Sequence, residues 1–460
     1  AAAGDRDAAV KAYEDHCKAS QPPHIRRAAF AALLRLDRDG GERRILAALH
    51  NGDALLKPAA IAGIVKLDVP GASEKFSAEL VGLEPDIQIL LIGALAARGD
   101  EGARRGIAAQ IENANENVAL AAIRSLGSMG DASSVPALAR VVAGPTKSER
   151  SLAALASLQQ LRGAKANEAI LAATEAAPAE GRASMIGVIA SRQMKEAVPF
   201  LMEQASNTDP RIASAALHGL GKLADPDQLP ALVDMIVKLE DSALQSDVSA
   251  AMVQIARKVE NPEKRSEAVL AAYRKTGTVS VKCAMLRALA QTAGAEALDS
   301  ALAAMGDQDK ELKEAATRAV ANWSDPEAAP RLLAQARSTD EPTAKVLLLR
   351  GAVRLLARSE KRPAKDVLSN YAEALQIATR TEEKRMVIAG LSSYPVAGAL
   401  GFLAPLLEDP DLRAEAAPAI VRIVKTRPDI DPGLAKSLLP KATAAMAAPA
   451  GQAREAVNKP

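Results

Sequence analysis

An apolar pattern that recurs about every 31 residues is the feature that most constrains this chain. Successive apolar segments of the first half end at positions 31 or 32 residues apart. These end positions are Leu36, Leu67, Arg98, Met129, Leu161, Arg192 and Leu223. Such a period is typical of stacked supersecondary units, none of which can bury its apolar face alone. The 460 residues can therefore form one long body, although length alone suggests about three ordinary domains.

Each of these segments has the pattern of an amphipathic helix. The segments are thirteen residues long and can be aligned so that each ends at one of those positions. In this alignment the seventh and tenth columns are apolar throughout. Because residues three apart share a helical face, each segment has one apolar face. The seventh column holds Phe30, Ile61, Ile92, Ile123, Leu155, Ile186 and Leu217, and the tenth holds Leu33, Ile64, Leu95, Leu126, Leu158, Ile189 and Leu220. The fifth column is mostly small, which predicts a close approach of neighbouring helices there. Its small members are Ala28, Ala59, Ala121, Ala153, Ser184 and Ala215.

Shorter helices are expected between these segments. Four prolines precede further apolar positions: Pro136, Pro199, Pro230 and Pro330. They are expected near the starts of these helices, because a proline is tolerated in the first turn of a helix. Asp-Pro pairs predict turns between the two helices; they begin at Asp209, Asp225, Asp325 and Asp409. Because a helix pair repeats in tandem, we predict an all-α fold, a right-handed α-α superhelix of about 13 helix pairs without strands.

This pattern resembles HEAT repeats. Asp209-Pro210-Arg211 and Asp411-Leu412-Arg413 are similar to the Asp–Arg turn of that family. The resemblance covers nearly the whole chain, and it implies a single continuous solenoid over residues 1–440, whose register loosens near 225–275 and 358–380. Residues 441–460 are expected to form an Ala/Pro-rich tail or linker.

Composition excludes several classes of protein. Apolar residues make up 48% and charged residues 25%, which is typical of a globular chain. The net charge of +2 provides no global attraction to nucleic acid or to an anionic membrane. Cys17 and Cys283 are the only thiols and lie about eight repeats apart, so we expect no disulfide between them.

Residues that carry chemistry are scarce. Among the four histidines, only His16 and His24 lie near a cysteine, Cys17. Neighbouring residues on a helix point about 100° apart, so His16 and Cys17 do not readily face one metal ion. His218 occupies the eighth column, where a surface or groove position is expected. The chain contains none of the common nucleotide-binding, hydrolase or metalloprotease motifs, so we predict no catalytic, cofactor-binding or metal-binding residue and no enzyme activity.

Nucleic-acid binding would require basic residues gathered on one face, repeat after repeat. In the first seven apolar segments, the fourth and eighth columns lie away from the packed columns and contain two arginines, Arg27 and Arg124, among fourteen positions. Aromatic residues, which stack on bases, make up only 2% of the chain. Trp323 ends one of the later helices and is expected to cap the apolar layer between two repeats.

The second half resembles a more specific group. Residues 293–424, which include the run NWSDPEAAPRLLAQARSTDEPTAKVLLLRGAVRLL, are similar to HEAT arrays of large secreted bacterial proteins. Such arrays often precede a jelly-roll domain of the 3-keto-disaccharide hydrolase type. No strand-rich segment follows residue 424, so the resemblance assigns no catalytic residue here. It implies an exported protein, periplasmic or extracellular, with the cytoplasm as the alternative.

These observations favour a non-catalytic protein-interaction scaffold, which would bind another protein or a fused domain and needs no cofactor. The first alternative is an accessory region of a secreted carbohydrate-active enzyme whose catalytic domain is not in this chain. The second alternative is a HEAT-type nucleic-acid-binding protein. The sequence leaves the partner, the binding face and the oligomeric state open.

Overall fold

The structure, a computed structural model, describes residues 3–37, 40–50, 53–144, 148–239, 241–359, 362–393 and 395–447. Within these ranges it contains 27 α-helices, six short 3₁₀ turns and no strand, which confirms the all-α prediction. The chain divides into two compact units, unit 1 (Ala1–Ala224) and unit 2 (Asp225–Pro460).

Unit 1 holds fourteen α-helices in its described part. They are α1 (Ala3–His16), α2 (Pro23–Leu36), α3 (Gly41–His50), α4 (Lys57–Ile64), α5 (Ala72–Ala78), α6 (Pro85–Arg98), α7 (Glu101–Ala108), α8 (Glu116–Met129), α9 (Val135–Ala143), α10 (Glu149–Gln160), α11 (Ala164–Ala176), α12 (Ala179–Ser191), α13 (Val198–Gln204) and α14 (Pro210–Leu223). Its 3₁₀ turns are η1 (Glu79–Gly82), η2 (Ala132–Ser134) and η3 (Lys195–Ala197).

Unit 2 holds thirteen α-helices in its described part. They are α15 (Leu229–Lys238), α16 (Ser242–Ala256), α17 (Pro262–Lys275), α18 (Val279–Thr292), α19 (Ala295–Ala304), α20 (Lys310–Ala321), α21 (Ala329–Ser338), α22 (Pro342–Leu356), α23 (Ala364–Ile377), α24 (Thr381–Ser393), α25 (Ala399–Leu403), α26 (Arg413–Thr426) and α27 (Pro432–Ala447). Its 3₁₀ turns are η4 (Pro226–Gln228), η5 (Pro326–Ala328) and η6 (Ala404–Leu407).

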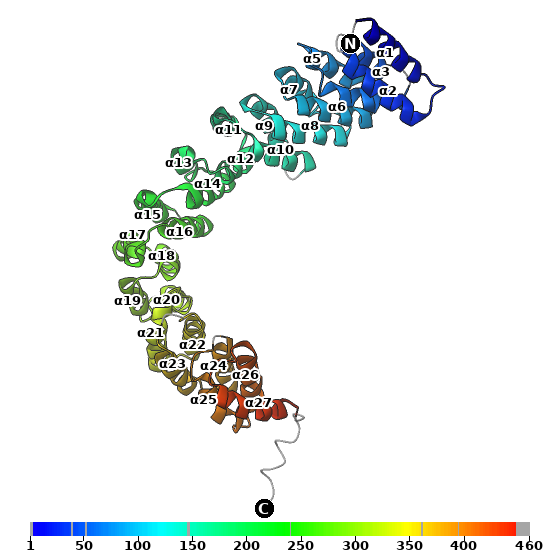
Figure 1. Ribbon diagram of the computed structural model, residues 1–460. Helices are drawn as coiled ribbons and strands as arrows, with labels where there is room; N and C mark the ends of the chain where they lie inside the picture. The colour runs from blue at the N-terminus through cyan, green and yellow to red at the C-terminus, as the bar shows by residue number, and fades with distance from the viewer. Residues whose placement is uncertain are drawn as a thin grey trace, which may run out of the picture. The chain divides into compact units, whose positions relative to one another are not determined.

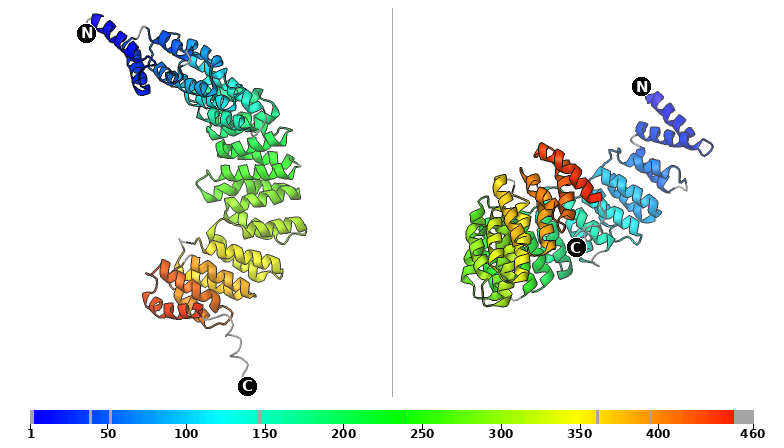
Figure 2. Two further views of the ribbon diagram at one scale, coloured as in Figure 1. Left: turned by 90° about the vertical axis from the view of Figure 1, so that its right-hand side faces the viewer. Right: turned by 90° about the horizontal axis from the view of Figure 1, so that it is seen from below.

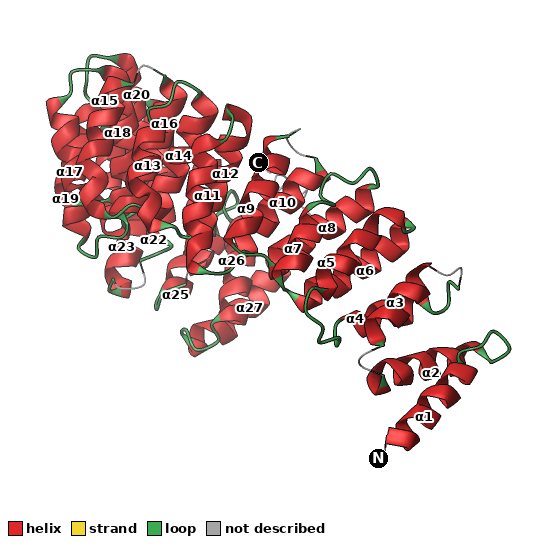
Figure 3. Ribbon diagram, turned by 90° about the horizontal axis from the view of Figure 1, so that it is seen from above, coloured by secondary structure: helices red, strands yellow, loops and turns green. Residues whose placement is uncertain are grey.

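Each unit consists of two packed layers of helices, and loops and short 3₁₀ turns connect one helix to the next (Figures 1 and 3). Every even-numbered helix packs against the odd-numbered helix before it and, within its unit, against the next even-numbered helix. The helices that are green to yellow in Figure 2 show this stacking within unit 2. The described residues thus form thirteen helix pairs followed by α27, which packs on α26, in agreement with the predicted number.

The division between the units falls at residues 224 and 225, where the repeat register was expected to loosen. Continuity of the solenoid across this point stays a prediction. The predicted tail begins inside α27, which extends to Ala447, and residues 448–460 lie outside the described residues. In the other irregular segment, α23 covers Ala364–Ile377, while Glu360 and Lys361 of the expected turn also lie outside the described residues.

The apolar columns of unit 1 form its core. All seven residues of the tenth column are buried, and so are the residues of the seventh column except Leu155, which is half-buried. The prediction for the fifth column is wrong. Its small residues are half-buried or, at Ala28, exposed, and the small residues that face a neighbouring helix lie one column further on, as at Ala60, Ala122 and Ala216.

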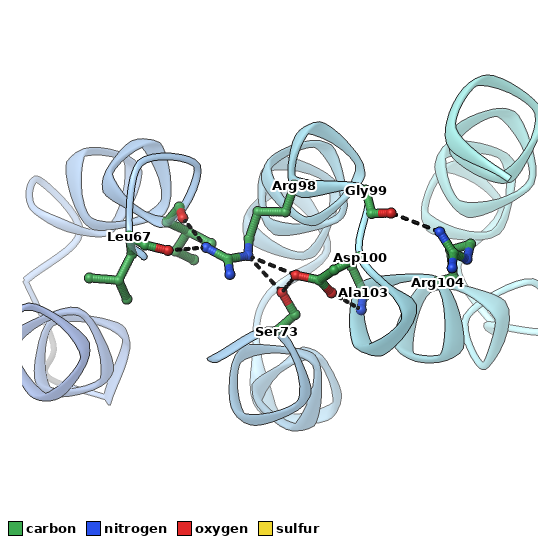
Figure 4. A network of polar contacts seen from close by, with 8 residues as sticks. Leu67, Ser73, Arg98, Gly99, Asp100, Ala103 and Arg104 are labelled. Atoms are coloured by element: carbon green, nitrogen blue, oxygen red, sulfur yellow. Dashed lines mark hydrogen bonds and ion pairs between the residues drawn. The ribbon is translucent and has the colours of Figure 1, made fainter. Parts of the chain in front are cut away.

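Arginine side chains tie several repeats to the ones before them. Arg98, at the end of α6, donates through Nη1 to the carbonyl oxygen of Ile64, the last residue of α4, and to that of Leu67 in the loop after it (Figure 4). Its Nε donates to Ser73 Oγ at 2.7 Å and to the carboxylate of Asp100 at 3.2 Å. The last carbonyl groups of a helix have no partner within the helix, so a cation placed there satisfies them and interacts favourably with the helix dipole.

The same device recurs further along the chain. Arg192 Nη1 donates to three carbonyl oxygens at the end of α10, those of Leu158, Gln159 and Leu161, at 2.8–2.9 Å. Arg354 donates to the carbonyl oxygens of Ala321 and Trp323 at the end of α20. Trp323 itself is only 1% exposed, so its side chain is buried, as the predicted cap between repeats requires.

The predicted turn chemistry is also present. Pro136, Pro199, Pro230 and Pro330 each lie in the first turn of an odd-numbered helix. Asp209 caps α14, because its carboxylate accepts from the Arg211 N–H and pairs with the Arg211 side chain at 2.8 Å. In the similar segment near residue 411, Arg413 donates instead to the Leu407 carbonyl oxygen.

Candidate interaction surface

The eighth column of the even-numbered helices forms an open surface on unit 1. Every residue of this column is exposed, although the seventh and tenth columns beside it are buried. Its members are Ala31, Ala62, Gly93, Arg124, Ala156, Gly187 and His218. Two large apolar residues are exposed near this column, Leu90 on α6 and Leu152 on α10, with 47% and 57% of their surfaces accessible. The surface is therefore mostly small and apolar, in agreement with the scarcity of arginine in this column.

This surface is hollowed between α8 and α10. The hollow has a volume of about 370 Å³ and is lined by Arg124, Glu149, Leu152, Ala153, Ala156, Ser157 and Gln160. Across its rim, Arg124 Nη2 and Glu149 Oε1 lie 3.2 Å apart, and both side chains are about two-thirds exposed. An apolar floor beside a polar rim is the arrangement common in protein interfaces.

The hollow follows from the small residues that α10 presents to α8. Ser151, Ala154 and Ser157 are buried and spaced three apart, so they lie on one face of α10. The two helices approach closely at Gly127, where an added Cβ would lie 2.7 Å from Ser157 Cα. Leu152 follows Ser151 and points about 100° away from it around the helix, so it lies off this packed face and is exposed.

The structure does not bring the ligand-like residues of the first repeat into a metal site. His16 and His24 are exposed, and Cys17 is a free cysteine whose pKa is raised by partial burial. Cys283 is also free and is buried, and burial raises its pKa as well. Within the described ranges, no group of three His, Cys, Asp or Glu residues could hold a metal ion. His218 lies on the exposed surface, where it was expected.

A second feature of the even-numbered helices was missed from the sequence. In unit 2 the positions equivalent to the eighth column on α18, α20 and α22 are Arg287, Arg318 and Arg350, all exposed. They follow one another at 31 and 32 residues, so the repeat period could have revealed them. The column was aligned only over the first seven repeats, in which Arg124 is its only arginine.

Comparison with known proteins agrees with this architecture. A family model described as HEAT repeats matches residues 73–159 and 167–253. These two segments are therefore similar to HEAT repeats, and the helix pairs of each unit share an all-α, two-layer arrangement. No protein of curated function matches the sequence.

None of the helices in the described ranges has the length and apolar character that crossing a membrane requires.

Several solved structures are similar to this chain at low identity. Kap95p, solved with RanGDP, is 15% identical over 96% of this chain and 72% of its own, with a TM-score of 0.48. Yeast importin-beta (Kap95p) alone is 15% identical over 96% of this chain and 65% of its own, with a TM-score of 0.39. Kap121p bound to Pho4p is 12% identical over 97% of this chain and 54% of its own, with a TM-score of 0.49. The chain thus spans only part of the length of each of these proteins, and at such identities the likeness carries no functional argument.

Proposed function

We propose that this protein is a non-catalytic interaction scaffold that binds another protein through the exposed surface of the even-numbered helices in unit 1. The observation that carries this proposal is the hollow between α8 and α10, with Leu152 exposed beside it. A partner that covers this exposed leucine and the apolar hollow is bound more tightly, since each Å² of apolar surface buried contributes about 25 cal/mol to the free energy of binding. The Arg124–Glu149 pair at the rim would orient the partner rather than supply most of the affinity.

The test is capture of partners from the protein's own host with a tagged full-length chain. Leu152→Asp puts a charge beside the hollow, and we expect capture of the specific partner to weaken about tenfold or more. Val81→Asp is the matched control, because Val81 lies on η1, away from this surface, and is 83% exposed. Equal capture by the wild-type chain and both variants would contradict the proposal, provided that all three melt at similar temperatures.

The similarity of residues 293–424 to arrays of secreted bacterial proteins leads to a separate prediction, that of an exported protein with a further, carbohydrate-active domain. The intact mass of the native gene product tests it. A mass above 47.8 kDa by about one ordinary domain would support the prediction, and a mass near 47.8 kDa would contradict it.

A further inference from the structure

Positive charge in unit 2 is concentrated on three consecutive even-numbered helices. Helices α18, α20 and α22 together contain eight Lys and Arg residues against two Glu, a net charge of +6, although the whole chain carries only +2. In unit 1, by contrast, α6, α8, α10 and α12 carry four basic and four acidic residues in total. Other even-numbered helices of unit 1 are also basic, such as α2 with three arginines and no acidic residue, but no three consecutive ones in that unit carry as much positive charge as α18, α20 and α22.

The exposed arginines Arg287, Arg318 and Arg350 form what we call the arginine ladder. Among the side chains that the structure describes, Arg287 and Arg350 make no hydrogen bond or ion pair. Arg318 pairs with Glu314 on its own helix at 3.2 Å, but both side chains are largely exposed, so this pair contributes little and is readily replaced. All three guanidinium groups are thus available to an incoming carboxylate, which they can bind in a bidentate manner.

The spacing of the ladder defines the shape of its ligand. Helices α18, α20 and α22 pack directly on one another, and the axes of packed helices lie about 8–10 Å apart. A polyproline II segment has three residues per turn and rises about 3.1 Å per residue, so side chains three apart share one side about 9 Å from each other. An extended peptide with an acidic residue at every third position would therefore place one carboxylate over each arginine.

We propose that the arginine ladder is a docking site for an extended acidic segment of a partner protein, with Asp or Glu at about every third residue. Nucleic acid fits this surface less well. Duplex DNA carries one charge per about 1.7 Å of its axis, and Glu311 and Glu314 on α20 would repel so dense a polyanion. The three helices contain no aromatic residue on which a base could stack.

The experiment compares two labelled twelve-residue peptides with the full-length chain, by fluorescence anisotropy. The first repeats Glu-Pro-Ala four times, and the second has the same composition with its four Glu residues consecutive. We expect the spaced peptide to bind more tightly than its isomer by about threefold or more, and its affinity to fall as salt rises. Equal binding of the two peptides would overturn the proposed spacing, and with it the proposal.

Two triple variants locate the site. Replacing the ladder in R287Q/R318Q/R350Q should weaken binding of the spaced peptide about tenfold. The control R274Q/R331Q/R337Q removes the same charge from α17 and α21, where these arginines pair with Glu296, Asp299 and Glu373. The control should bind within about twofold of the wild-type chain. Equal loss in both triple variants would contradict the proposal, since it would show only non-specific attraction.

A short DNA duplex serves as the third probe. Tighter binding of the duplex than of the spaced peptide, lost in the ladder variant, would overturn the proposal in favour of nucleic acid. The scaffold function proposed above is tested at Leu152 in the other unit, so peptide binding can fail while the partner capture still depends on Leu152. The two failures are therefore distinguishable.

Discussion

Arg192 shows how a single residue joins two repeats. It is half-buried at the end of α12, and its burial lowers the pKa of the guanidinium while Glu196 partly opposes the shift. Besides the three carbonyl groups at the end of α10, it also reaches Asn167 of α11, since its Nε donates to Asn167 Oδ1 at 2.9 Å. One side chain therefore fixes the position of α12 relative to two earlier helices.

We expect Arg192→Met to loosen α10 and α12. Methionine keeps much of the apolar stem but leaves the carbonyl groups of Leu158, Gln159 and Leu161 without this donor, a loss of about 1–3 kcal/mol in local stability. Hydrogen exchange over residues 149–192 should accelerate accordingly. Arg105→Met is the control, because Arg105 is 70% exposed and pairs only with Glu101 one turn away, so protection should change little. Unchanged exchange in the Arg192 variant would show that the clamp has no energetic role.

Asp209 provides a pH-dependent prediction at the same scale. Hydrogen bonds from the Arg211 side chain and backbone lower the pKa of this carboxyl from 3.8 to about 2. A carboxyl group whose pKa is lower in the folded state stabilises the fold above about pH 4, and this contribution is lost as the pH falls toward 2. In Arg211→Gln, NMR titration should place the Asp209 pKa between 2 and 3.8, because the backbone N–H remains. A pKa still near 2 would assign the whole shift to the backbone.

At the scale of the helix, glycine marks where two even-numbered helices touch. Gly127 of α8 lies against the backbone of Ser157 in α10, so an added methyl group would have to push the two helices apart. Gly187 of α12 has no atom within 4 Å of the position that its Cβ would take. Both glycines lie inside helices, and they differ mainly in this contact.

These two glycines form a matched pair of variants. Gly127→Ala should destabilise unit 1 by about 1–3 kcal/mol through overpacking, despite the better helix propensity of alanine. Gly187→Ala should stabilise it by about 0.5–1 kcal/mol, since only the propensity changes. Urea unfolding followed by circular dichroism measures both changes. Shifts of the same sign in the two variants would mean that α8 and α10 do not approach as closely as the structure shows.

The helices also show what the sequence could and could not predict. The tenth column was predicted correctly because large apolar residues such as Leu126 and Leu220 are strongly favoured inside. The fifth column was wrong because alanine occurs on both faces of these helices, so Ala121 and Ala122 look alike in sequence although only Ala122 is buried. The hollow beside Leu152 could not be predicted either, since it depends on how closely α8 and α10 pack.

At the scale of the whole molecule, the net charge of the chain does not show how charge is distributed among the helices. A balance of +2 predicts no global attraction to polyanions, yet it is compatible with +6 on three neighbouring helices. Only the superposition of successive repeats brings Arg287, Arg318 and Arg350 onto adjacent helices. In a solenoid, residues about 31 positions apart are neighbours, so charge has to be counted by column rather than by segment.

The locality of the solenoid leads to the last prediction, which concerns where the chain can be cut. Each repeat is held by its neighbours, so a fragment that ends after a complete helix pair retains its core. Residues 1–224 end after α14, at the boundary of unit 1. Residues 1–208 remove α14 but keep α13, whose Leu201 is buried against α14 near Gly219.

We expect the fragment 1–224 to be helical and monomeric and to melt cooperatively, because unit 1 has its own buried columns. The fragment 1–208 should melt at a lower temperature and aggregate, since it exposes Leu201 and the face of α12 that packs on α14. Circular dichroism and light scattering on the two fragments measure both properties. If the two melt alike, α14 adds nothing to α13 and the helix pair is not the unit of stability; if neither folds, unit 1 depends on the rest of the chain.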